Sequence, residues 1–327
     1  MSRRIFGTMR NAANMGLGVP GLRVQAWDDD WPAGDDFMGE DITDANGRYE
    51  MAYADVHWDT PGFEVSGGRP DIYVTVEIRN SRDKWVRLGK SQVFKDHDLS
   101  HDLQIDLDVE IAPSIQKRIP FLPNQHGFHF LNNFKLKPDI LGINLGKWEM
   151  GFCGGMCAGA LQRYDHHIPI PADTVTPADD TPLFEELLAR QMKSFPVDLL
   201  PVLYDWQSAP DISNPWRKTS IAQRTKDEWP KLKRELDADR PTTIILIRSD
   251  GYLGNPTQNH QVLAIGYEFN PATKDLTIFE YDPNKQDEEN TLSMSLGLPD
   301  GSLYLKDSAS RKTRGFLVNP AGPFASR

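Results

Sequence analysis

Cys153 and Cys157 are the only cysteines of this sequence and its best candidates for nucleophilic chemistry. They lie in the stretch Gly151-Phe-Cys-Gly-Gly-Met-Cys-Ala-Gly159, where the glycine pair favours a tight turn and the residues after it favour a helix. Cys153 would start that helix, where free N–H groups and the positive end of the helix dipole stabilise a thiolate. We therefore predict that Cys153 is a nucleophile. Cys157 is a secondary candidate, better explained as a small core residue.

A nucleophilic thiolate needs a base, and the base needs a group that orients it. His260 opens an apolar, strand-like run that ends near Tyr267, and a second such run from Leu276 ends at Asp282. The segment between the runs is rich in turn-forming residues, so we expect a hairpin. A hairpin places the start of its first strand beside the end of its second, which brings His260 next to Asp282. Asn284 is an alternative orienting group.

The order Cys153, His260, Asp282, with the cysteine at a helix start and the other two on neighbouring strands, resembles the papain-like cysteine peptidase superfamily. The resemblance covers roughly residues 120–284. It implies an α+β domain in which Cys153 attacks an amide or acyl carbonyl, His260 transfers the proton and Asp282 orients the imidazole. The sequence departs from papain because no glutamine stands shortly before Cys153, so Asn144 becomes the candidate side chain of the oxyanion hole.

Two other interpretations of these residues lead to different classes of protein. Cys153 and Cys157 could bind zinc together with the adjacent His166 and His167, because cysteine and histidine are the usual zinc ligands. A helix that begins at Cys153 disfavours this geometry, and we predict neither a metal nor another cofactor. Alternatively, a papain-like core could persist as a non-catalytic scaffold for binding. Contact between Cys153 and His260 would favour catalysis over the scaffold.

Residues 1–110 have a different pattern, with short stretches of alternating apolar and polar residues at 22–27, 72–78 and 103–109. This alternation, interrupted by Gly, Asp and Pro, predicts an antiparallel β-sandwich. The sequence Thr43-Asp-Ala-Asn-Gly-Arg-Tyr49 between an acidic loop and a strand resembles the transthyretin-like family. The resemblance implies a module for binding or presentation.

The predicted fold is therefore an all-β transthyretin-like sandwich (1–110), a Pro-punctuated linker (111–122) and an α+β papain-like domain (123–327). Within the last domain we predict amphipathic helices at 182–195 and about 225–237, and a buried strand at 242–248. His126 and His129 lie in an aromatic stretch and are expected to be structural, because no partner stands at metal-ligand spacing.

The acidic residues of the segment 28–36 allow two interpretations. Asp28, Asp29, Asp30, Asp35 and Asp36 could surround a calcium ion, which takes oxygen ligands from flexible loops. Their spacing lacks the regular ligand alternation of an EF-hand. A solvated negative loop that protects a strand edge is the favoured explanation.

Composition limits the partners of the chain. With 327 residues, a formal charge of −11 and a pI near 5.2, it is poorly suited to nucleic acid or to an anionic membrane. No apolar run is long enough to span a bilayer, and no apolar core follows the basic N-terminus as in a signal peptide. We expect a protein, peptide or cell-wall peptide substrate, and a location in the cytoplasm or export without a signal peptide. No feature specifies an oligomeric state.

Overall fold

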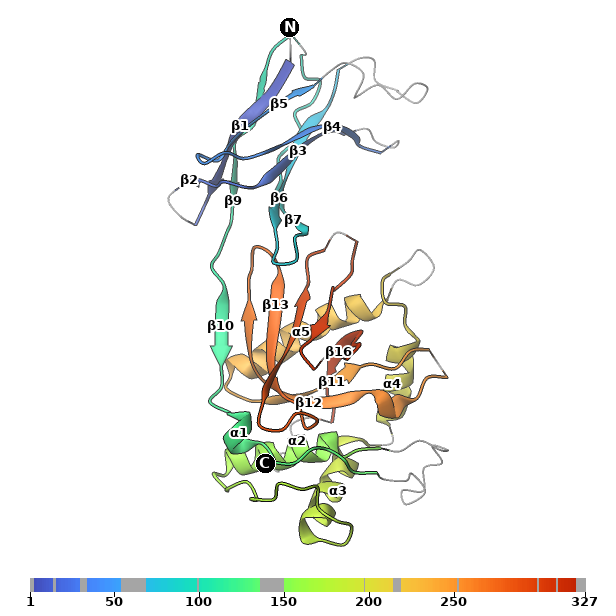
Figure 1. Cartoon of the computed structure of the whole chain (residues 1–327). Helices are drawn as coiled ribbons and strands as arrows, with labels where there is room; N and C mark the ends of the chain where they lie inside the picture. Colours follow the sequence, from blue (N-terminus) through green and yellow to red (C-terminus); the bar gives the residue numbers. More distant parts are fainter. Residues whose placement is uncertain are drawn as a thin grey trace. The chain divides into compact units, whose positions relative to one another are not determined.

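The structure is a computed structural model that describes residues 3–13, 16–29, 34–53, 69–98, 100–135, 150–196, 198–213, 219–251, 253–298, 300–309 and 311–321. The chain divides into two compact units. One contains residues 1–114 with the short segments 270–275 and 297–299, and the other contains the remaining residues. The first unit is mostly β and the second mixes helices with strands (Figure 1). The predicted succession of a β region and an α/β region is thus confirmed.

The N-terminal unit contains two sheets. In the first sheet the central strand β1 pairs antiparallel with β2 and β5 and parallel with β8 and β9. The second sheet has the order β4-β3-β6-β7 and is antiparallel throughout. The strands are β1 (Arg3–Asn11), β2 (Leu17–Gly18), β3 (Arg23–Asp28), β4 (Asp36–Ile42), β5 (Arg48–Tyr53), β6 (Ile72–Arg79), β7 (Trp85–Lys90), β8 (Leu103–Gln104) and β9 (Leu107–Val109).

Side-chain alternation explains why these strands form one core. Along β3 every second residue is buried, including Val24 and Ala26, and in β1 the same period buries Ile5 and Met9. These side chains from both sheets belong to a single apolar cluster. The stretch 103–109, expected as one strand, forms the two short strands β8 and β9. Between them the carboxylate of Asp106, in place of a backbone carbonyl, accepts from the Thr8 N–H at 2.8 Å.

The turn 43–49 is built by the residues that define its motif. The Asp44 carboxylate accepts hydrogen bonds from the backbone N–H groups of Asn46 and Arg48, both at 2.8 Å, and these bonds lower the pKa of Asp44. Gly47 has φ +76°, a conformation that L side chains rarely adopt. Tyr49 donates a hydrogen bond to the buried Ile105 carbonyl at 2.8 Å. Asp44, Gly47 and Tyr49 therefore each have a local structural function in this turn.

The C-terminal unit is organised around a seven-stranded sheet of order β15-β14-β13-β12-β11-β16, with β10 also paired to β12. β11, β12 and β13 are antiparallel neighbours, as the predicted hairpin requires. The strands are β10 (Ile115–Arg118), β11 (Thr242–Ile247), β12 (His260–Phe269), β13 (Asp275–Tyr281), β14 (Glu289–Ser295), β15 (Lys306–Asp307) and β16 (Gly315–Val318).

Both faces of this sheet are covered by helices, which explains the continuous apolar sequence of β11. Ile245 and Ile247 pack in the cluster of α2 and α3, whereas Ile244 and Leu246 pack in the cluster of α5 (Figure 1). The helices are α1 (Pro123–His126), α2 (Cys153–Asp165), α3 (Pro182–Ser194), α4 (Leu199–Ser208) and α5 (Ile221–Asp237), with a 3-10 turn η3 (Pro256–Gln258).

The helix starts follow capping chemistry. Thr181 and Ser220 cap α3 and α5 by accepting from the N–H groups of Phe184 and Gln223. Because of the Ser220 cap, α5 begins four residues before the predicted start at Thr225.

None of the helices in the described ranges is long and apolar enough to cross a membrane.

The segment 111–122 differs from a simple linker. Residues 115–118 form β10, which pairs antiparallel with the end of β12, and Ile119 and Phe121 are buried. A basic, Pro-flanked sequence is compatible with such a strand when it pairs over only a few residues and ends before a proline. The second unit therefore starts before residue 123, at Ile115.

Two further expectations concern single groups. His126 accepts a hydrogen bond from the Leu122 N–H at 2.8 Å, and His129 lies 2.6 Å from Asp287, so both have local partners.

In the acidic segment 28–36, Asp28 is buried and accepts a hydrogen bond from the Asp71 N–H at 2.7 Å. Asp30 lies outside the described residues.

Candidate active site

Cys153 is the first residue of α2, and its side chain is 9% exposed. The glycine pair after it is required by close packing. A Cβ on Gly154 would lie 2.1 Å from the Ser194 hydroxyl, and one on Gly155 would lie 2.3 Å from the Leu187 carbonyl. Both of these neighbours are on α3, so the glycines let α2 and α3 approach each other. This contact fixes the start of α2 and, with it, the position of the Cys153 sulfur.

His260 and Asp282 are brought together by the hairpin of β12 and β13. The Nε2 atom of His260 lies 2.5 Å from Asp282 Oδ1, and both side chains are buried. With Asp282 ionised, Nε2 carries the proton and donates it to this bond, which leaves Nδ1 for the sulfur. The same Oδ1 accepts from the Asn284 N–H at 2.8 Å, so the carboxylate is itself held in place.

Asn284 is close to the imidazole without replacing Asp282. Its Nδ2 lies 3.2 Å from His260 Nε2 and 3.5 Å from Nδ1. The shorter, charge-assisted bond to Asp282 is the stronger orienting contact. Asp282 therefore occupies the predicted position, and Asn284 covers the edge of the ring.

The charges of Cys153 and His260 stabilise each other. Burial alone raises the pKa of the Cys153 thiol. The hydrogen bond and charge of His260, with the N–H groups of Gln261 and Gly154, outweigh burial and bring the pKa below its ordinary value. Burial also lowers the pKa of His260, but the charge and hydrogen bond of Asp282, helped by Cys153, raise it to about 9. Both shifts favour a thiolate–imidazolium pair more than the ordinary pKa values of the two side chains would.

Cys157 is in the opposite electrostatic environment. It is fully buried one turn further along α2, and its Sγ donates a weak hydrogen bond to the Gln261 carbonyl at 3.7 Å. Burial raises its pKa well above the ordinary value, and the negative charges of Cys153 and Asp282 raise it further. Cys157 is therefore a neutral packing residue. Both cysteines are free thiols.

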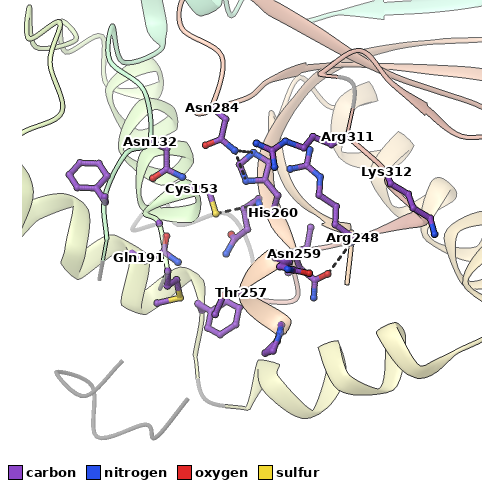
Figure 2. Close-up of a pocket in the computed structure, with 18 residues that line it drawn as sticks. Asn132, Cys153, Gln191, Arg248, Thr257, Asn259, His260, Asn284, Arg311 and Lys312 are labelled. Carbon is purple, nitrogen blue, oxygen red and sulfur yellow. Dashed lines mark hydrogen bonds between the residues drawn. The ribbon is translucent and has the colours of Figure 1, made fainter. Parts of the chain in front are cut away.

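Cys153 and His260 open onto a cavity of about 400 Å³ (Figure 2). Apolar side chains and amide groups contribute much of its wall, and Gln261 donates its N–H to the Cys153 sulfur at 3.4 Å. The lining residues are Asn132, Phe134, Met150, Gly151, Cys153, Gln191, Phe195, Ile245, Arg248, Pro256, Thr257, Gln258, Asn259, His260, Gln261, Asn284, Arg311 and Lys312.

Asn132 is a polar group beside the nucleophile that the sequence did not identify. Its Oδ1 accepts from the Phe152 N–H at 2.7 Å, which turns the amide against Gly151 and leaves Nδ2 as a donor next to Cys153. The predicted oxyanion residue, Asn144, lies outside the described residues. Asn132 precedes Cys153 by a long segment, so only the fold reveals their proximity.

A second cluster of ionisable side chains lies close to Asp282 and His260. Arg248 pairs with Asp307 at 2.9 Å, and Thr313 donates to the same carboxylate oxygen at 3.0 Å. Glu280 is also buried, and neither of its oxygens has a hydrogen-bond partner among the described residues. Burial, with the negative charges of Asp282 and Asp307, raises the pKa of Glu280 to about 8. Glu280 is thus a neutral carboxylic acid at pH 7.

The zinc interpretation finds no matching ligand set. Across the described residues, no group of three or more His, Cys, Asp and Glu side chains could hold a metal ion. His166 and His167 follow the C-terminal end of α2 and are exposed, whereas Cys153 and Cys157 belong to its buried first turns.

Comparisons with known proteins do not assign a family. No protein-family model matches the chain, and no curated protein matches it. One solved structure, a 9R-lipoxygenase from Cyanothece PCC8801, aligns with 98% of this chain at 15% sequence identity and a TM-score of 0.25. The chain spans 42% of that lipoxygenase. Similarity at this level carries no argument, so the function has to be inferred from the site.

Proposed function

We propose that this protein is a cysteine hydrolase or acyl transferase of papain-like type, acting on an amide or related acyl bond, with the N-terminal unit as a transthyretin-like binding or presentation module. The observation that carries the proposal is the site around Cys153. A thiol of lowered pKa at a helix start contacts a histidine that a buried carboxylate orients. These are the nucleophile, base and orienting group of covalent catalysis.

The chemistry of each residue follows from this arrangement. The Cys153 thiolate attacks the substrate carbonyl carbon, an S–C bond forms, and the carbonyl electrons move to the oxygen. The His260 imidazolium then gives its Nδ1 proton to the leaving amine as the C–N bond breaks, which leaves a thioester. Water attacks the thioester while His260 takes its proton, and the acid product and the thiolate are released. Asp282 keeps Nε2 protonated throughout.

Two donors support the oxyanion. The first N–H groups of an α-helix have no intrahelical acceptor, so the Cys153 N–H is directed at the developing charge. Asn132 supplies a side-chain donor because its own oxygen is already bonded to the Phe152 N–H. We therefore propose Asn132 for the oxyanion-hole role that the sequence had suggested for Asn144.

A chromogenic acyl donor tests this proposal without knowledge of the natural substrate. With p-nitrophenyl acetate, acylation of Cys153 releases nitrophenolate in a burst of about one equivalent per chain before slower turnover. Cys153→Ala should lose the burst, and Cys157→Ala is the matched control that should keep it. Equal slow hydrolysis by both variants and the wild type would refute the nucleophile and favour a non-catalytic scaffold.

A further inference from the structure

The cavity next to Cys153 carries two cationic side chains that the catalytic mechanism does not use. Arg311 and Lys312 both line it and both are exposed. Figure 2 shows them on the same side of the cavity as Arg248, across from Asn132 in this view. Their sequence position, more than 150 residues after the nucleophile, gave no indication that they reach the site.

These two cations are not neutralised by the protein. Arg248 has a buried partner in Asp307, whereas neither Arg311 nor Lys312 forms an ion pair with any of the described residues. Among the described residues that line the cavity, none is Asp or Glu. The thiolate and imidazolium of the catalytic pair cancel each other, and the ionised Asp282 bonded to the imidazole offsets only one of the two positive charges of Arg311 and Lys312. The cavity therefore has a net positive charge.

This charge is opposite to that of the whole chain, which has 47 acidic and 36 basic residues. An acidic surface repels anionic ligands in general, and a local positive region selects the point at which an anion can approach. Unpaired cations beside a reactive cysteine are consistent with recognition of a substrate group.

We propose that the substrate of this site is an acidic acyl compound, in which a carboxylate close to the scissile amide or ester binds Arg311 and Lys312. The inference rests on the proposed function and specifies its substrate class. The planar guanidinium of Arg311 suits bidentate binding of a carboxylate, and the Lys312 ammonium adds a second charge. Phe134, Met150 and Phe195 form an apolar part of the wall that accommodates the rest of the acyl group.

Two alkylating reagents of nearly equal size test the charge preference directly. Iodoacetate carries a carboxylate and iodoacetamide is neutral. With either reagent the Cys153 thiolate displaces iodide, as one S–C bond forms and one C–I bond breaks. The rate ratio of iodoacetate to iodoacetamide at Cys153, measured by peptide mass spectrometry, reports attraction of an anion to the cavity independently of thiol reactivity.

The wild-type ratio should exceed that of a small free thiol. The double variant Arg311→Glu/Lys312→Glu should lower it by at least about fivefold at low salt, because two charges change sign within a Debye length of the sulfur. The iodoacetamide rate of each protein, measured in parallel, normalises the ratio for any change in the reactivity of the thiolate itself. Lys306→Glu, at an exposed position that does not line the cavity, is the control for overall charge and should leave the ratio unaffected.

The outcomes separate the two proposals. A ratio that the double variant leaves at the wild-type value overturns the acidic substrate, even where iodoacetamide labels Cys153 rapidly. Slow labelling of Cys153 by both reagents refutes the nucleophile and the substrate class together. If the double variant does not fold, the single variants Arg311→Ala and Lys312→Ala and the salt dependence of the wild-type ratio give the same test. A wild-type ratio insensitive to salt then contradicts the proposal.

Discussion

The two units of this protein treat ionisable groups differently. In the N-terminal unit the core is apolar, and its buried carboxylates, Asp28 and Glu77, each have a hydrogen-bonding or ionic partner. In the C-terminal unit Cys153, His260 and Glu280 are buried around the start of β12 and the end of β13. Burial of charge lowers stability unless it is compensated. On this comparison we propose that the chemistry lies in the second unit and that the first unit serves in binding.

The largest expected effect is on turnover when the orienting carboxylate is removed. Asp282→Asn keeps the size of the side chain but no longer holds the Nε2 proton or stabilises the imidazolium, so turnover of an ester or amide substrate should fall by about 10³- to 10⁴-fold. Iodoacetamide labelling of Cys153 should fall much less, because a thiolate can form without an aligned proton transfer. Comparable losses in both assays would show that Asp282 maintains the fold and does not orient the base.

The two cysteines provide the next comparison, inside one helix. At pH 7 iodoacetamide should label Cys153 at least about a hundredfold faster than Cys157, because the pKa of Cys153 is lowered and that of Cys157 is raised. Mass spectrometry of the two labelled positions measures both rates in one sample. Equal slow labelling would contradict the nucleophile assignment.

Glu280 tests the consequence of an uncompensated buried carboxyl. Its pKa is about 8 in the folded state against an ordinary value of 4.5. Between these values the folded protein retains a proton that the unfolded chain has released, so the free energy of unfolding falls as pH rises. Glu280→Gln does not titrate. Its stability relative to wild type should increase from pH 4.5 to 8 by on the order of 4 kcal/mol.

Denaturant unfolding of both proteins at several pH values measures this difference. Any constant effect of the substituted amide cancels when only the change with pH is compared. A stability difference that stays flat over the whole range would mean that Glu280 is ionised in the folded protein, with a partner that supports its charge.

A smaller effect is expected in the N-terminal unit. Gly47→Ala introduces a Cβ at φ +76° that would lie 2.5 Å from the Met9 carbonyl oxygen, so unfolding of this unit should require about 1–3 kcal/mol less. Gly21→Ala is the matched control, since Gly21 has φ +75° but nothing within 4 Å of the added Cβ. Neither change should alter labelling of Cys153. Reduced labelling would show that the first unit contributes to the site.

The sequence predicted the parts of the site that depend on local pattern and hairpin topology. A cysteine at a helix start, a histidine at the start of a strand and a carboxylate at the end of the next strand come together because antiparallel pairing fixes their register. Asn132, Arg311 and Lys312 could not be predicted, because they reach the cavity through the packing of segments distant in sequence. Glu280 lies in a strand-like run whose apolar neighbours gave no sign of its environment.

For the fold as well, the sequence predicted elements with a clear local pattern and missed those that depend on packing. Period-two and helical patterns located β3, β6, β11, the β12–β13 hairpin, α2, α3 and α5, whereas strands such as β1, β4, β7 and β14 were not predicted. β10 was missed because four residues between prolines form a strand only when a partner edge is present. α4 was missed because Leu199-Leu-Pro-Val-Leu-Tyr204 is apolar almost throughout, which hides the helical spacing of Leu199, Leu203 and Trp206. It also contains a proline, which the first turn of a helix tolerates.

The central claim is that Cys153 and His260 act as one unit, and the pH profile of Cys153 alkylation tests it most directly. In the wild type, the lowered pKa of Cys153 and the His260 pKa of about 9 predict that the labelling rate rises at a lower pH than that of an unassisted thiol. In His260→Ala, burial without the imidazolium should raise the thiol pKa, so labelling should be slow at pH 7 and rise steeply above pH ~8.5. Identical profiles of the two proteins from pH 5 to 9 would contradict the catalytic pair.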